Sequence, residues 1–138
     1  MKPQNEMKMQ LESRSVNEGY ARVAVAAFAA TLDPTLEEIN DIKTAVSEAV
    51  TNCIVHAYKN TMGIIYITVR LFENGKVEIK IRDRGCGIAD VEKAREPLFT
   101  TGGGDRAGLG FSVMESFSDN VRVRSKVGSG TTVTLIKY

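Results

Sequence analysis

Alternating apolar and polar residues mark strands in three parts of the chain. Residues 7–11 follow the period-two pattern of a strand with one buried face. Residues 64–72 and 76–82 also alternate, and the Asn-Gly pair between them is a strong hairpin signal. Residues 121–127 and 131–138 flank a Gly-Ser-Gly turn and predict a second hairpin. The sequence therefore predicts one early strand and two hairpins.

Two capping boxes predict where the long helices begin. Ser15 is followed three residues later by Glu18, and Thr35 by Glu38, so each pair can satisfy free amides at a helix start. An Asp-Pro pair at 33–34 separates the two helices. The expected helices span about residues 15–31, 35–58, 91–95 and 111–117.

Pairs of strands separated by helices favour an α+β fold, a two-layer α/β sandwich, over a parallel doubly wound sheet. The 138 residues are 43% hydrophobic and 25% charged, as in an ordinary globular chain. This length suits one buried core. We therefore expect a single domain over residues 1–138.

Charge and composition exclude several classes of function. The formal net charge of +1 gives no general attraction to nucleic acid. The longest apolar run, residues 23–30, is too short to cross a bilayer, and the N-terminus has no signal-like apolar region. No membrane association and a cytoplasmic location are expected. The two cysteines, Cys53 and Cys86, lack histidines at zinc spacing and are expected to be reduced thiols.

Glu48 and Asn52 lie one turn apart on the polar side of the second predicted helix. An ordinary solvated face is the simplest interpretation. However, Ala45 and Val55 interrupt this side and no Lys or Arg accompanies it, which favours a second, partly covered face. A carboxylate and an amide so placed could orient a hydroxyl and a magnesium ion. The opposite, core-facing arc holds Ile42, Val46, Ala49, Val50, Cys53 and Ala57.

His56 continues this spacing, but it is the only histidine in the chain. A lone helical histidine is more often a packed or capping residue than a catalyst. We therefore assign His56 a structural role.

A glycine-rich turn follows the strand at 76–82. Asp83 stands at the strand end, where it could accept from an amino group, and Gly85 and Gly87 could let a flat ligand approach the backbone. A plain turn explains the same residues. Taken alone, this segment is better explained as a plain turn.

A second glycine-rich segment, TTGGGDRAGLGF at 100–111, leads into a helix. Amides at a helix start can bind an anion, and glycines would let the segment close over phosphates. A disordered linker is the alternative, but the adjoining helix argues against it. The sequence contains neither a Walker A loop nor a Rossmann fingerprint.

Four motifs occur one after another along the chain: ExxxN, DxGxGI, GxG before a helix, and GTT on a late strand. In this order they resemble the Bergerat-fold (GHKL) ATPases. SEAVTNCIVHAY, IRDRGCGI, EPLFTTGGGDRAGLGFSVMESFSDNVRV and GSGTTVTL are similar to the anti-sigma factor serine/threonine kinases over nearly the whole chain. The resemblance implies an ATP-binding sandwich with a mixed, mostly antiparallel sheet.

The resemblance also implies roles for individual residues. Glu48 would be the general base that activates the acceptor hydroxyl, and Asn52 would bind the Mg²⁺ that bridges the phosphates. Asp83 would recognise the adenine amino group, with help from Gly87 and, through water, from Thr131. The cofactor is accordingly expected to be ATP or ADP with Mg²⁺.

Residues 100–110 resemble the nucleotide lid of these kinases, with Arg106 near the phosphates and the amides around Gly108 and Gly110 holding them. Three successive glycines at 102–104 depart from the more decorated lid expected for the family, and the departure concerns lid ordering and partner contacts more than nucleotide binding. The implied nucleotide-binding residues are Asn52, Asp83, Gly85, Gly87, Thr100, Thr101, Arg106, Gly108, Gly110 and Thr131.

By resemblance, the expected function is that of an anti-sigma factor. It would inhibit a sporulation sigma factor of RNA polymerase, of the sigma F type, and use ATP to phosphorylate a serine of the anti-anti-sigma factor. A homodimer is implied, and Arg22 is a candidate partner contact, although a solvated arginine explains it equally well. Two alternatives stay open: a non-catalytic, nucleotide-gated sigma-binding module, and an ATPase or histidine kinase fragment.

Overall fold

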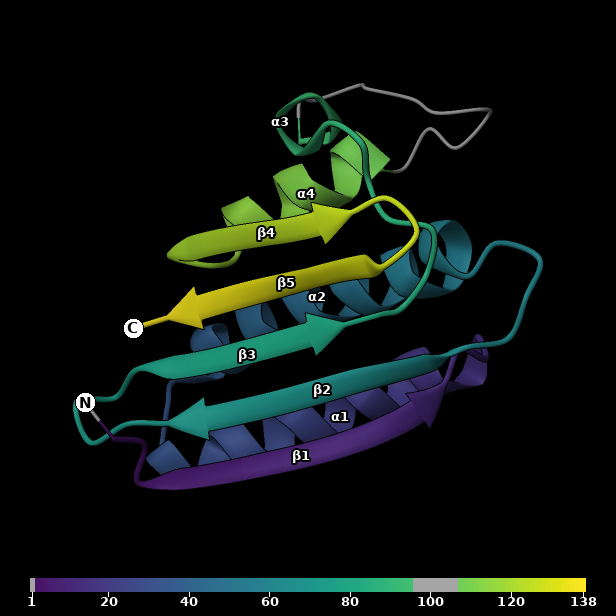
Figure 1. Cartoon of the computed structure of the whole chain (residues 1–138). Helices are drawn as coiled ribbons and strands as arrows, with labels where there is room; N and C mark the ends of the chain where they lie inside the picture. Colours follow the sequence, from purple (N-terminus) through teal and green to yellow (C-terminus); the bar gives the residue numbers. More distant parts are fainter. Residues whose placement is uncertain (1, 96–106) are drawn as a thin grey trace.

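One antiparallel sheet organises the molecule, in the order β1-β2-β3-β5-β4 (Figure 1). The computed structural model describes residues 2–95 and 107–138. Both predicted hairpins and the mostly antiparallel sheet are confirmed, and each strand pairing within the described residues is antiparallel. The strands are β1 (Asn5–Glu12), β2 (Ile64–Leu71), β3 (Val77–Arg82), β4 (Asn120–Lys126) and β5 (Gly130–Lys137).

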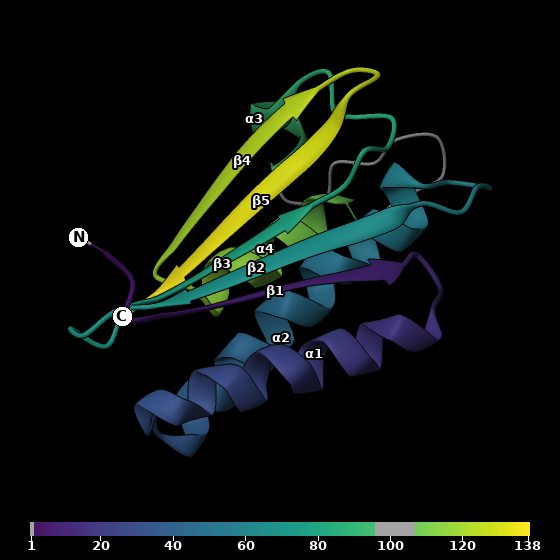
Figure 2. The same cartoon turned by 60° about the horizontal axis from the view of Figure 1, so that its bottom comes forward.

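The long helices form a second layer on one face of the sheet (Figure 2). This arrangement confirms the predicted two-layer sandwich. The helical segments are α1 (Val16–Ala29), the 3-10 turn η1 (Ala30–Leu32), α2 (Leu36–Asn52), the π-helical turn η2 (Cys53–Ala57), α3 (Val91–Ala94) and α4 (Ala107–Ser116).

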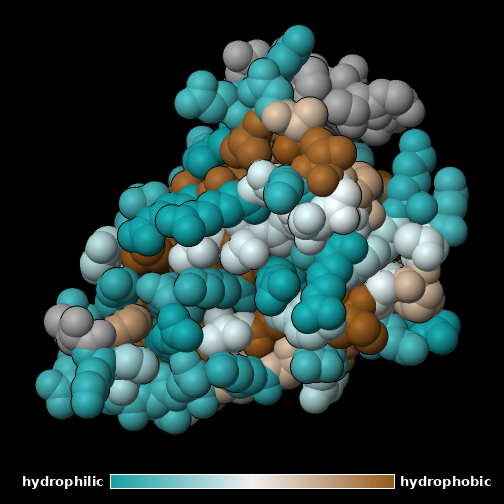
Figure 3. Space-filling model, viewed as in Figure 1, coloured by the Kyte–Doolittle hydropathy of each residue, from teal (hydrophilic) through white to brown (hydrophobic). Residues whose placement is uncertain are grey.

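The period-two pattern of the strands explains why the sheet is covered on one face. Along β2, Ile65, Ile67, Val69 and Leu71 are buried beneath the helices, and the residues between them point to the other face. Each such buried aliphatic side chain contributes about 1.5–3 kcal/mol. The face away from the helices is largely hydrophilic (Figure 3).

The two predicted capping boxes have different outcomes. At Thr35 the prediction is confirmed, because its hydroxyl accepts from the Glu38 amide and the Glu38 carboxylate accepts from the Thr35 amide. At Ser15 it is wrong, because this residue has helical backbone angles and makes no side-chain cap bond. The Glu18 carboxylate instead accepts a hydrogen bond from the Ser47 hydroxyl of α2. A tertiary contact has replaced the local cap.

The second long helix does not continue regularly to residue 58. It becomes π-helical over Cys53–Ala57, where the Tyr58 amide donates to the Cys53 carbonyl at 3.0 Å. The Tyr58 hydroxyl donates to the Ile64 carbonyl and accepts from the Arg84 amide, both at 2.6 Å. These bonds fix Tyr58 between two other segments, and the wider helical turn accommodates that position.

No helix in residues 2–95 or 107–138 is long and apolar enough to span a membrane.

The caps give a direct test of this account. Thr35→Ala should lower the free energy of unfolding by about 1 kcal/mol, because it removes a hydrogen-bonded N-cap. Ser15→Ala should change it by much less, because Ser15 caps nothing through its side chain. Urea unfolding of both variants measures the difference, and equal losses would contradict the assignment.

Candidate functional site

A buried carboxylate marks the end of β3. Asp83 is only 5% exposed. Its Oδ1 accepts hydrogen bonds from the backbone amides of Gly85 at 2.9 Å and Thr131 at 3.1 Å. Its Oδ2 accepts from the thiol of Cys53, with 3.7 Å between sulfur and oxygen. One oxygen is therefore satisfied by two amides, while the other has only a weak donor among the described residues.

Burial shifts the pKa values of both Asp83 and Cys53. Burial raises the pKa of Asp83, although the amides of Gly85 and Thr131 oppose the shift. Burial and the charge of Asp83 raise the pKa of the Cys53 thiol well above its usual range. Cys53 is thus a neutral thiol that can donate a hydrogen bond.

The glycines after Asp83 are explained by close backbone packing. A Cβ at Gly85 would overlap the carbonyl oxygen of Ala57, and one at Gly87 would overlap that of Lys126. Gly87 also has φ of +78°, which favours glycine. Close packing is therefore sufficient to require glycine at both positions, independently of the expected clearance for a flat ligand. Their role in nucleotide binding stays a prediction.

Helix α2 presents Glu48 and Asn52 on a half-buried face, as the sequence predicts. Four residues at a rise of about 1.5 Å place them about 6 Å apart along the helix axis. A Cβ at Gly110 of α4 would lie 3.0 Å from the Asn52 amide oxygen. Asn52 therefore lies directly against the beginning of α4.

Glu48 lies at a groove between α1 and α2. The groove has a volume of about 320 Å³. Arg22, the candidate partner contact, lines the same groove and is 3.9 Å from the Glu18 carboxylate. The structure thus brings Arg22 and Glu48 to one surface feature. The other lining residues are Asn40, Lys43, Thr44 and Ser47.

Helix α4 begins earlier than predicted. It starts at Ala107 instead of about residue 111, so Gly108 and Gly110 belong to its first turn. The low helix propensity of glycine favoured a loop there, but packing of Gly110 against Asn52 overrides it. The first amides of a helix have no intrahelical acceptor and can bind an anion. Thr100, Thr101 and Arg106 lie outside the described residues.

Thr131 supports Asp83 through its backbone. Its amide binds the carboxylate, while its hydroxyl lies 2.7 Å from the Ser125 hydroxyl. Ser125 also accepts from the Ile88 amide at 2.7 Å. Sequence reasoning missed Ser125, although counting outward from the Gly-Ser-Gly turn pairs it with Thr131.

Cys53 and Tyr58 were also missed as site residues. Both lie in or next to the π-helical turn, whose contacts with the Asp83 loop are tertiary. No local sequence signal identifies such contacts.

A magnesium ion fits this site only as a partner of a bound ligand. Residues 2–95 and 107–138 contain no cluster of three or more His, Cys, Asp or Glu side chains that could hold a metal alone. Asn52 offers one amide oxygen. Mg²⁺ commonly takes a few protein oxygens together with phosphates and water, so Asn52 suits a nucleotide-bound ion.

Comparison with known proteins identifies the family. Residues 10–137 match the Histidine kinase-like ATPase domain. The anti-sigma F factor of Caldanaerobacter subterraneus is 56% identical over 100% of this chain and 96% of its own length. That of a Geobacillus strain, WCH70, is 55% identical over 97% of this chain and 92% of its own. The chain belongs to the anti-sigma F factor family. Its ATPase-type domain implies binding of ATP or ADP.

Solved structures agree on the fold of this anti-sigma F family member. The RsbU and RsbW domains of a Mycobacterium tuberculosis protein align with a TM-score of 0.71 and 22% identity, over 98% of this chain and 32% of that one. The mycobacterial sensor histidine kinase MprB aligns with a TM-score of 0.60 and 15% identity, over 95% and 97%. At such identities the likeness concerns the fold alone. Together with the match to the ATPase domain model, it confirms the expected GHKL architecture.

The close packing at Gly85 can be tested by comparing it with Gly19 of helix α1. Gly85→Ala should lower the thermal midpoint and weaken ATP binding, because its Cβ would displace the Ala57 backbone. Gly19→Ala is the control, since the nearest atom to its added Cβ is 3.6 Å away. It should stabilise α1 by up to about 1 kcal/mol. A neutral effect of Gly85→Ala would contradict the described packing.

The raised pKa of Asp83 predicts a pH-dependent stability. Its contribution is fully present below the unfolded-state pKa, about 3.9, and is lost as pH rises through the higher folded-state pKa. Asp83→Asn removes this ionisation. Unfolding of the nucleotide-free protein between about pH 4 and pH 8 should therefore increasingly favour the variant as pH rises. Asp33→Asn, at the surface, controls for lost charge. A pH-independent difference would be inconsistent with the raised pKa.

Proposed function

We propose that this protein inhibits a sporulation sigma factor of RNA polymerase, of the sigma F type, and uses ATP with Mg²⁺ to phosphorylate a serine of its anti-anti-sigma antagonist. Phosphorylation would release the antagonist and leave the sigma factor bound. Sequence identity of 55–56% over 97–100% of this chain to proteins named anti-sigma F factor supports the first part. The arrangement of α2 and its neighbours supports the second.

One observation carries the catalytic proposal. Glu48, Asn52 and Cys53 follow one another along α2 into η2, and the Cys53 thiol contacts Asp83. A nucleotide with its base at Asp83 would bring its phosphates toward Asn52 and the start of α4. An acceptor hydroxyl beyond the phosphates would then lie near Glu48. The adenine base, the phosphates and the acceptor hydroxyl would thus be arranged along one rigid helix.

The proposed transfer needs only one proton acceptor from the protein. Glu48 takes the serine proton as the serine oxygen forms a bond to the γ-phosphorus, and the bond from that phosphorus to the β,γ-bridging oxygen breaks to release ADP. Asn52 would hold Mg²⁺, which supplies charge neutralisation. Amides at Gly108 and Gly110 would hold the phosphates. We also propose roles at the phosphates for Thr100, Thr101 and Arg106.

Partner binding is proposed at two places. Arg22 shares a groove with Glu48, so a partner bound there would bring its serine near the general base. Strand β1 is an edge of the sheet, and an edge strand offers unpaired backbone groups to a second copy. We therefore propose a homodimer in which β1 takes part.

Labelled ATP distinguishes this function from its alternatives. The protein is incubated with γ-labelled ATP, Mg²⁺ and purified anti-anti-sigma protein, and the labelled residue is identified by mass spectrometry. Label on a serine of the antagonist supports the proposal. Release of phosphate without labelled protein would indicate an ATPase, and nucleotide-dependent sigma binding without either reaction would indicate a non-catalytic module.

Glu48→Gln should separate binding from catalysis. ATP affinity measured by calorimetry should be retained, while the rate of serine phosphorylation should fall by about two to four orders of magnitude, as expected for a lost general base. Asn52→Ala is the comparison, because it should weaken binding of magnesium-ATP itself. An unchanged transfer rate in Glu48→Gln would refute the role given to Glu48.

A further inference from the structure

The thiol of Cys53 takes no part in the proposed phosphate transfer, yet it contacts the carboxylate of Asp83. We propose that Cys53 is a specificity-determining residue, which strengthens selection of adenine by donating a hydrogen bond to Oδ2 of Asp83. The inference rests on the proposed nucleotide site. It adds that the adenine amino group is recognised by a carboxylate oxygen already oriented by a thiol.

The two oxygens of Asp83 have different surroundings. Oδ1 accepts from two backbone amides, so both of its lone-pair directions are occupied. Oδ2 accepts from the Cys53 thiol and, among the described residues, from no other group. It therefore keeps acceptor capacity although Asp83 is only 5% exposed. A buried carboxylate oxygen with spare capacity suits an incoming N–H donor.

A thiol is suited to this position for three reasons. Cys53 is 4% exposed and stays protonated, so it remains a donor. An S–H group is a weak donor, which leaves Oδ2 a good acceptor for a second hydrogen bond. The long C–S bond lets sulfur reach within 3.7 Å of the oxygen, whereas the shorter C–O bond of serine would leave a hydroxyl beyond normal hydrogen-bond distance.

The alternative is that Cys53 only fills space in the core. A pair of ligands separates the two roles: ATP, and purine riboside triphosphate, which lacks the 6-amino group. Calorimetry with magnesium present measures both affinities. Cys53→Ala and Cys53→Ser should each weaken ATP binding by about 3- to 10-fold, the range for one modest hydrogen bond. Binding of the analogue should change by less than about twofold.

Cys86→Ala is the matched control, because Cys86 is an exposed thiol in the adjoining loop whose sulfur lies 3.4 Å from the His56 carbonyl oxygen. It should leave the ratio of the two affinities unchanged. Equal weakening of both ligands by the Cys53 variants would show a packing role and overturn the inference, as would unchanged affinities. If wild-type protein itself fails to prefer ATP over the analogue, the assignment of Asp83 to adenine fails as well.

A spectroscopic measurement avoids replacing Cys53. In the Cys86→Ala background, Cys53 supplies the protein's S–H stretching band in the Raman spectrum. ATP should shift this band, because its amino group would share Oδ2 with the thiol, and purine riboside triphosphate should not. An S–H band that does not shift with ATP, or that shifts equally with both nucleotides, would overturn the inference. This measurement holds even if the Cys53 variants fail to fold.

Discussion

The hydrogen bonds to the buried carboxylate of Asp83 fix the geometry around the site. Burying a carboxylate without partners costs several kcal/mol, and here the Gly85 and Thr131 amides compensate by binding one of its oxygens. The loop after β3 must therefore turn tightly. That turn brings Gly85 against the Ala57 backbone, where the Cys86 amide donates to the Ala57 carbonyl at 3.1 Å. Strand β5, the loop and the π-helical turn are thereby held in one arrangement.

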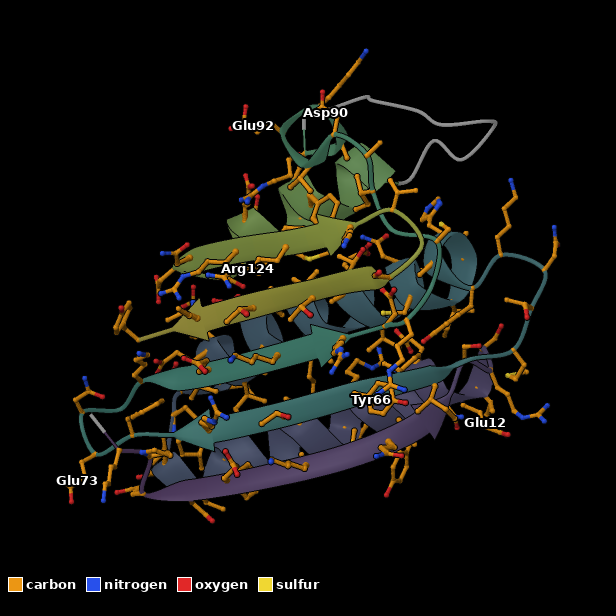
Figure 4. All side chains as sticks on the ribbon, viewed as in Figure 1. Glu12, Tyr66, Glu73, Asp90, Glu92 and Arg124 are labelled. Atoms are coloured by element: carbon orange, nitrogen blue, oxygen red, sulfur yellow. The ribbon has the colours of Figure 1, made fainter. Side chains whose placement is uncertain are left out.

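The uncovered face of the sheet adjoins this site at one place, where Tyr66 and Arg84 line a pocket together with Gly85. Tyr66 and Arg124, labelled in Figure 4, belong to strands whose buried side chains face the helices, but they point to the opposite side. The Arg84 guanidinium lies 4.9 Å from the centre of the Tyr66 ring. Arg84 therefore belongs to the outer face, while its neighbour Asp83 is buried.

The sequence predicts well those features that depend on local periodicity. Alternation along β2 is sufficient to identify its buried face, and the Asn-Gly and Gly-Ser-Gly turns set the registers of both hairpins. The Thr35 cap is also local, since both partners lie within one helical turn. The spacing of Glu48 and Asn52 indicates a shared helix face. The roles expected for these two residues come only from the family resemblance, which depends on the order of the later motifs.

Tertiary contacts account for what local patterns missed. Glu18 binds Ser47 of another helix and so does not complete a cap with Ser15. Packing of Gly110 on Asn52 extends α4 through glycines that locally favour a loop. The π-helical turn depends on bonds from Tyr58 to two distant segments. In each case the deciding partner lies outside the window that a sequence pattern can examine.

The support of Asp83 by Thr131 spans 48 positions of the chain. During synthesis the ribosome releases Asp83 long before Thr131, and β5 must then pair with β3 before the second amide reaches the carboxylate. A nascent chain that has completed its helices and its first hairpin still lacks one of the two amides that bind the Asp83 carboxylate. If nucleotide binds at the proposed site, full binding would require the last hairpin, and translation products that end before β5 would not compete for ATP.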